Sequence, residues 1–209
     1  MTRVILSVVA TLAIFCAAVV MLAKGSEHVP QAARNTSEGT ASSQPLILQE
    51  SEGERLVHRG GPLGHLPLTI KVDEQNGGAQ DFVVFTETLP PGKTIPFHKH
   101  SNAEEILFFD DAGATVTVAD KRAVAGARTI VCIPRNTWIS ASNTGTQDVH
   151  LVSIFSRQGF ERYLRAVSVK EGQPVNPISA DELQQARALG HATYWDTSQG
   201  QYPPGVAHP

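Results

Sequence analysis

Between about Pro45 and Asp196 the chain consists of short apolar runs separated by turn residues. The runs are rich in Val, Ile, Thr and Phe, and segments such as GGPLG, EQNGGAQ and NTGTQD interrupt them. Many short β-prone runs with turn signals between them are typical of an antiparallel sandwich or a small barrel. We therefore predict an all-β fold, with strands at RLVH, LPLTIKV, DFVVFTETL, EILFF, ATVTVAD, TIVCI, WISAS and VHLVSIF.

The pattern inside each run predicts how the strand is buried. ATVTV alternates, so one of its faces should be buried and the other exposed. TIVCI and EILFF do not alternate, so both faces of these two strands are predicted to be covered. Cys132, inside TIVCI, is accordingly predicted to be a small buried residue.

Helical periodicity occurs only near the end of the body. GFERYLRAV, residues 159–167, spaces its apolar side chains at i, i+3, i+4 and i+7, which predicts a short amphipathic helix. Further on, Ser179 and Glu182 form a capping box, and Gly190 provides a stop signal. We expect both helices to pack on the outside of the barrel.

The N-terminal pattern is different. Val4 to Ala23 carries no charge, and Arg3 and Lys24 flank it. A membrane-spanning helix needs about 20 apolar residues, whereas the apolar core of a signal peptide has about 7–15. Residues 1–23 are therefore predicted to be a signal peptide or, as the length favours, an uncleaved membrane anchor. Either would make the body extracytoplasmic, periplasmic or secreted, and linked to the membrane only through this segment.

Composition divides the rest of the chain. Residues 24–44 are rich in Ser, Thr, Gly, Gln and Ala, so they are predicted to form a flexible tether. Residues 45–196 form the predicted barrel with its C-terminal helices, and residues 197–209 a disordered tail.

The formal charge is −3 with no basic block, so no nucleic-acid partner is expected. Phosphate-loop, nucleophile-elbow and zinc-knuckle spacings are lacking, so no organic cofactor site is predicted.

Candidate chemistry is concentrated in HKHSNAEE. His98 and His100 are two residues apart, so on a strand they point to the same face. Across a turn, Glu104 or Glu105 begins the next strand and can lie beside them. Two imidazoles and one carboxylate suit iron, and zinc or manganese could also occupy such a site. The alternative is a polar loop with solvated histidines.

The spacing around His98 matches a longer motif. Gly92 is followed by five residues, then His98-x-His100, then four residues and Glu105. In this respect the sequence resembles the first motif of the cupin superfamily, and the resemblance extends over about residues 92–155. It implies a small antiparallel jelly-roll barrel with His98, His100 and Glu105 as metal ligands. Glu104 would then face outward, support the site from beside Glu105 or act as a base.

The second cupin motif, Pro-x-Gly-x-x-His-x-x-x-Asn, is present only in part. PRNTWISASN retains Pro134 and Asn143, but Asn136 stands where Gly is usual and Ile139 where His is usual. In metal-binding cupins this histidine completes a three-His-one-Glu ligand set.

Three alternatives follow from the missing histidine. In the first, His98, His100 and Glu105 alone hold the metal and water completes the shell; three protein ligands plus water is a normal count for a catalytic zinc site. His150, on the next predicted strand, could replace the missing imidazole. Finally, the barrel could bind a small ligand without a functional metal. The other histidines of the body, His58, His65 and His191, are interpreted as surface or structural residues.

Two classes of function remain. In the first, a divalent metal (Fe, Mn or Zn) in the barrel acts on a small-molecule substrate; the resemblance to cupin oxygenases implies dioxygenation or carbonyl isomerisation. In the second, the protein is a non-catalytic small-ligand-binding or structural cupin with a vestigial metal site. Pairing of two copies into a homodimer is a further open alternative in this family.

Overall fold

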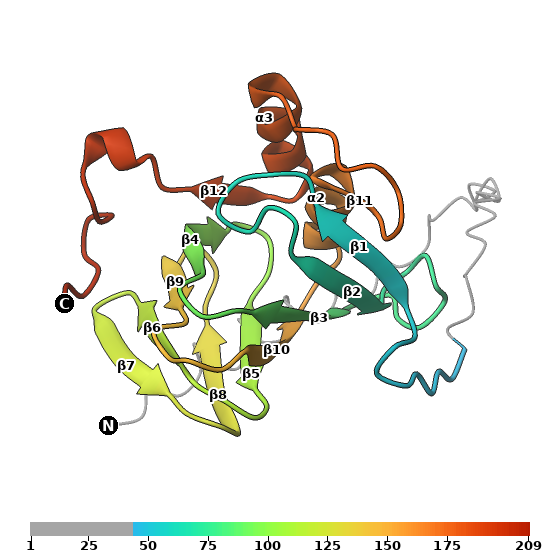
Figure 1. The fold of residues 1–209 in the computed structure, drawn as a ribbon, viewed down its shortest axis with the longest axis horizontal. Helices are drawn as coiled ribbons and strands as arrows, with labels where there is room; N and C mark the ends of the chain where they lie inside the picture. The colour runs from blue at the N-terminus through green and yellow to red at the C-terminus, as the bar shows by residue number, and fades with distance from the viewer. Residues whose placement is uncertain (1–43) are drawn as a thin grey trace, which may run out of the picture. The chain divides into compact units, whose positions relative to one another are not determined.

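The computed structural model describes residues 44–209 (Figure 1). The predicted signal peptide or anchor and nearly all of the predicted tether lie outside the described residues. Among the helices of residues 44–209, none is long and apolar enough to cross a membrane. Export therefore stays a prediction.

Two antiparallel sheets form the body, as the strand pattern predicts. The larger has seven strands, in the spatial order β11 (Ser168–Lys170), β1 (Glu54–His58), β2 (Pro67–Val72), β3 (Val83–Leu89), β10 (Val149–Phe155), β5 (Glu105–Phe109) and β8 (Thr129–Ile133). The smaller has five strands, in the order β12 (Ala192–Tyr194), β4 (Thr94–His100), β9 (Ile139–Ser142), β6 (Ala114–Val118) and β7 (Lys121–Ala125). Successive strands of the chain often lie in different sheets, as the strand order shows.

The core consists of side chains on the inner faces of both sheets. On β3, Val83, Phe85 and Leu89 are buried because alternate residues of a strand point to one face. One cluster, the aromatic cluster, combines Phe85, Phe155, Phe160 and Tyr163 with aliphatic side chains. A second, mainly aliphatic cluster lies around Phe109.

Two helices follow the barrel strands. α2 (Phe160–Ala166) and α3 (Ala180–Leu189) match the predicted segments, and the capping box of Ser179 and Glu182 is present. Figure 1 shows both near β1, β11 and β12. The expectation that they only cover the outside is wrong for α2, whose Phe160 and Tyr163 belong to the aromatic cluster. The helix thus closes part of the interior.

The outer faces of β5 and β8 are open, contrary to prediction. Ile106 and Ile130 are exposed, and so is Cys132. β8 lies at the edge of its sheet, where the strand has a neighbour on one side only. A continuous apolar run here reflects an apolar outer surface, so the prediction of a buried Cys132 is wrong.

The C-terminal segment, where a disordered tail was predicted, packs on the body. It includes the 3₁₀ turn η1 (Thr197–Gln199), and Val206 is buried. The Tyr202 ring packs edge-on against Phe97, with 6.0 Å between ring centroids. The backbone N–H of Ala207 donates to the carbonyl of Ala119 over 2.8 Å. Aromatic contacts between distant parts of the chain thus order a segment whose own composition predicts no structure.

A buried ion pair fixes α2 to the larger sheet. Arg165 lies 2.5 Å from Oδ2 of Asp73, whose side chain is fully buried, and its Nε donates to Glu54 over 2.7 Å. The second carboxylate oxygen of Asp73 accepts the backbone N–H groups of Gln75 and Asn76. Asp73 is therefore satisfied only while Arg165 is present.

We expect Arg165→Met to lower the free energy of unfolding by about 3–5 kcal/mol, because it leaves the Asp73 carboxylate buried without its counter-charge. Urea unfolding of the purified protein measures this loss. Arg55→Ala is the control: Arg55 pairs with Glu171 at the surface, with both side chains 45% exposed, so its loss should cost less than about 1 kcal/mol. Equal effects of the two substitutions would contradict the prediction.

Candidate metal centre

His98 and His100 lie on β4 with their side chains inside the body. Their exposed fractions are 4% and 2%, so neither imidazole is in bulk solvent. The two rings meet edge to face, with 4.9 Å between their centroids. Lys99, between them, is only partly buried, as the alternation of a strand requires. The prediction that the two histidines share one face is confirmed.

Glu105 approaches the same point from the other sheet. It is the first residue of β5, and its buried Oε2 lies 3.5 Å from Nε2 of His100. Ligand atoms of His98, His100 and Glu105 all lie within 4.8 Å of one another. β4 belongs to the five-stranded sheet and β5 to the seven-stranded sheet. The short turn between them therefore carries the chain from one layer to the other and leaves the three side chains facing each other.

The neighbouring Glu104 takes no part in this cluster. Its side chain is exposed, and its backbone N–H donates to Ser156 Oγ over 2.9 Å. Of the two glutamates that the sequence left open, Glu105 is the one placed with the histidines.

Several polar atoms of the cluster lack the partners that buried groups normally have. Both ring nitrogens of His100 and Oε2 of Glu105 are buried without a hydrogen bond to any described residue. Leaving a polar group buried and unsatisfied costs about 1–3 kcal/mol. His98 Nδ1 lies 2.8 Å from the Pro96 carbonyl. Because a carbonyl only accepts, Nδ1 carries the proton and Nε2 keeps its lone pair for a ligand.

Burial also sets the charge of the cluster. It lowers the pKa of His98 to about 4 and, together with the nearness of His98, holds the pKa of His100 well below its usual value. Both imidazoles are therefore neutral at pH 7, the form that binds metal. Burial, assisted by the charge of Glu87, raises the pKa of Glu105 to about 8. A divalent ion would have to displace that proton.

Two polar residues that sequence reasoning did not assign to the site line the same small cavity of about 40 Å³. Glu87 lies on the inner face of β3, between Phe85 and Leu89, and burial raises its pKa to about 7. His58 ends β1; it is buried, its Nε2 has no hydrogen-bond partner among the described residues, and burial lowers its pKa to about 4. The alternation of FVVFTETL, which puts Glu87 in step with Phe85, is a signal that could have identified it.

Ile139 occupies the place that faces the first histidine. In the pairing of β4 with β9 it lies directly opposite His98, and its side chain lines the cavity with 1% exposure. His150 does not compensate for it. That residue lies on the outer side of β10, half exposed, with Nδ1 2.5 Å from the carboxylate of Asp111. The alternative that His150 completes the ligand set is therefore wrong.

Aromatic rings close the cavity on the helix side. Phe160 of α2 meets the His100 ring at 4.5 Å between centroids, and Tyr194 of β12 stacks on His98 at 5.3 Å. Tyr163 stacks in turn on Phe160. A volume of about 40 Å³ holds on the order of one or two water molecules. Any larger molecule requires these rings to move.

A family model described as the cupin domain matches residues 85–155. Residues 85–155 therefore form a cupin domain. The match begins within β3 and ends with β10, so it contains His98, His100 and Glu105 and precedes both helices. The turns of both cupin motifs keep the backbone that glycine favours: φ is 76° at Gly92 and 60° at Asn136, a residue type that tolerates this region.

Similar solved structures include the polyketide cyclase RemF from Streptomyces resistomycificus, with 13% identity over 70% of this chain and 99% of that one and a TM-score of 0.48. A predicted oxalate decarboxylase from Thermotoga maritima has 21% identity over 54% of this chain and 100% of its own chain, with a TM-score of 0.47. KdgF from Halomonas sp. has 12% identity over 44% of this chain and 80% of its own chain, with a TM-score of 0.39. No curated protein matches the chain.

The cluster fits a divalent metal ion. It offers two neutral imidazoles and one carboxyl group, and three of its buried polar atoms have no hydrogen-bond partner in residues 44–209. Borderline ions such as iron, manganese and zinc accept this mixture of nitrogen and oxygen ligands.

Titration of the buried carboxyl groups predicts an unusual pH dependence for the metal-free protein. Between about pH 6.5 and 8, Glu105 and Glu87 keep protons in the folded state that the unfolded chain, with carboxyl pKa values near 4.5, has already lost. Stability therefore falls as pH rises through this window, because the folded state binds more protons. Thermal melting of chelator-treated protein at several pH values measures the slope. Glu105→Gln should flatten it, and a rising melting temperature would contradict the assignment.

Proposed function

We propose that this cupin binds one divalent metal ion through His98, His100 and Glu105 and acts on a small molecule held against it. The observation that carries the proposal is the convergence of three buried ligand atoms within 4.8 Å, while both ring nitrogens of His100 and Oε2 of Glu105 have no hydrogen-bond partner among the described residues. When bound, the metal supplies Lewis-acid or oxygen chemistry, and dioxygenation or carbonyl isomerisation are the proposed reactions. Iron or manganese suits dioxygenation, whereas zinc, which has no redox chemistry, suits only isomerisation.

The other polar residues of the cavity have a supporting role in this proposal. Glu87 shares the cavity with Glu105 and has a pKa raised to about 7, so it gains or loses a proton near neutral pH. A carboxyl group with such a pKa is suited to general acid and base work. Ile139 and Leu107 provide apolar walls that exclude water from the ligands.

A second candidate is a non-catalytic cupin with a vestigial metal site. Two observations favour it: the apolar Ile139 opposite His98, and the small volume left by the aromatic rings of α2 and β12. Export through residues 1–23 and assembly as a homodimer remain predictions under either candidate.

Metal content tests the first candidate directly. We expect the purified protein, loaded anaerobically with iron(II) or with manganese(II) and desalted, to retain about one ion per chain by elemental analysis. His98→Ala should abolish this retention, because two protein ligands remain. His150→Ala is the matched control, since that histidine faces outward, and it should retain the ion. A wild-type protein without bound metal would refute the proposal.

Restoring the missing ligand separates the two candidates. Ile139→His places an imidazole opposite His98, so we expect metal affinity to rise by at least about tenfold, which corresponds to 1.4 kcal/mol. Isothermal titration with manganese(II) measures the gain. If the wild type binds no ion and the substituted protein binds one, the site is vestigial and the second candidate holds.

A further inference from the structure

A second hollow lies on the opposite, outer face of the five-stranded sheet. On β9 and β6 the residues that point away from the metal centre carry hydroxyl groups, and β4 adds Thr94 beside Pro96 and Phe97. Strand pairing aligns them in two rows across the sheet: Thr94, Ser142 and Thr115 in one row, Ser140 and Thr117 in the other.

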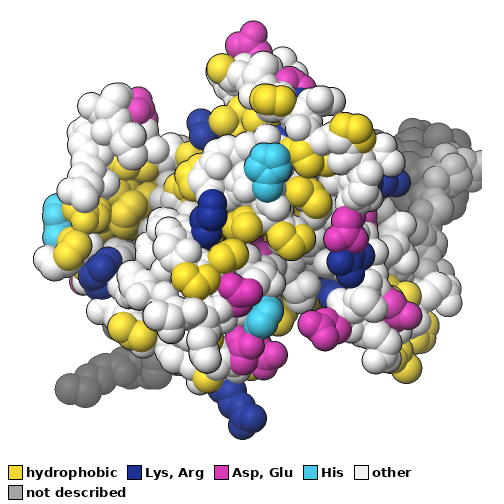
Figure 2. All heavy atoms as spheres, viewed as in Figure 1, with side chains coloured by type: hydrophobic (Ala, Val, Ile, Leu, Met, Phe, Trp, Pro, Cys, Tyr) yellow, Lys and Arg dark blue, Asp and Glu magenta, His cyan; other side chains and the backbone are white. Residues whose placement is uncertain are grey.

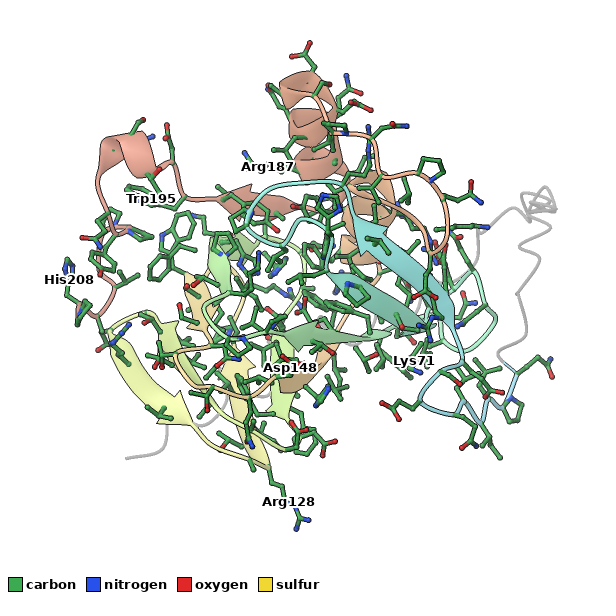
Figure 3. All side chains as sticks on the ribbon, viewed as in Figure 1. Lys71, Arg128, Asp148, Arg187, Trp195 and His208 are labelled. Carbon is green, nitrogen blue, oxygen red and sulfur yellow. The ribbon has the colours of Figure 1, made fainter. Side chains whose placement is uncertain are left out.

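The C-terminal segment turns this face into a groove of about 340 Å³. Trp195 and Tyr202 come from that segment, and Phe97 comes from β4. The indole of Trp195 is held by a 2.8 Å hydrogen bond from Nε1 to the Gly200 carbonyl, and its backbone N–H donates to Phe97. Figure 3 labels Trp195 on this segment, on the side of the body where β6, β7 and β9 lie, and Figure 2 shows yellow side chains between the segment and the body.

One charged residue lines the groove. Arg122 of β7 donates from Nη1 to Thr117 Oγ1 over 3.1 Å, and it forms no ion pair with any described acidic residue. A guanidinium has five N–H donors in a planar fork that matches a carboxylate. No Asp or Glu of the described chain lines the groove, so nothing there competes for that fork.

The hydroxyl rows are only partly used within the protein. Thr94 donates to Ser142 over 3.0 Å, and Thr115 lies 3.3 Å from Thr144. Each hydroxyl can donate once and accept twice, so these contacts leave acceptor positions open along the row. Nearby aromatic rings offer flat apolar surface with polar edges.

We propose that this groove binds a small sugar acid: a hydroxyl-rich ring that packs on Trp195 and Tyr202, bonds the Thr and Ser rows, and presents its carboxylate to Arg122. The volume is in the range of small-molecule pockets, about 300–1,000 Å³. The site is separate from the metal centre, because alternate residues of the same strands face the two sides.

Tryptophan fluorescence is a suitable measurement because the chain has two tryptophans, and Trp138 and Trp195 lie in edge-to-face contact at 5.8 Å. We expect galacturonate, titrated into chelator-treated protein at low salt, to give a saturable change in emission. Glucose should bind at least about tenfold more weakly, since a charge-assisted hydrogen bond is lost. Chelation removes any ion from the metal centre, so the galacturonate carboxylate cannot change the emission by binding an ion there.

Matched variants decide the assignment. Arg122→Gln should weaken galacturonate binding by about tenfold or more and leave glucose binding unchanged. Lys121→Gln removes one positive charge from the adjacent, exposed position of β7 and should leave both unchanged. No saturable change, equal binding of glucose, preference for glucose 6-phosphate, or insensitivity to Arg122→Gln would each overturn the proposal.

Discussion

The burial of three ligand groups at the junction of two sheets is the constraint on which the rest of this structure depends. The chain crosses from one layer to the other between His100 and Glu105, so polar side chains meet where the two inner faces meet. Water is excluded there, and desolvation disfavours the charged form of every group. The site is therefore neutral when empty, with protonated Glu105 and unprotonated imidazoles. A divalent ion would replace the Glu105 proton, so metal affinity would depend on pH.

Local patterns were sufficient to predict much of this molecule. The strand series, the two helices and the capping box each depend on residues a few positions apart, and the structure contains them. His98 and His100 share a face for the same local reason. The choice between Glu104 and Glu105 needed the cupin spacing, because either residue could begin the strand, and the structure buries Glu105.

Features that depend on distant partners were predicted poorly. Glu87 and His58 enter the cavity from β3 and β1, more than ten residues from any ligand, and no short motif links them to it. The inward position of α2 follows from how Phe160 meets the His100 ring across the fold. Apolar runs at β5 and β8 look buried from composition alone. The exposure of Ile106 and Ile130 shows that the outer face of these strands is open, which depends on how the whole body packs.

The strand β12 links the metal centre to the outer groove. Tyr194 faces inward and stacks on His98, while Trp195, one residue later, faces the outer groove. β12 is the last strand of its sheet and pairs only with β4, over three residue pairs. A small edge strand of this kind is more easily displaced than a central one. The cavity at the metal centre and the outer groove are thus contacted by two adjacent residues. A shift of β12 would therefore change both sites at once.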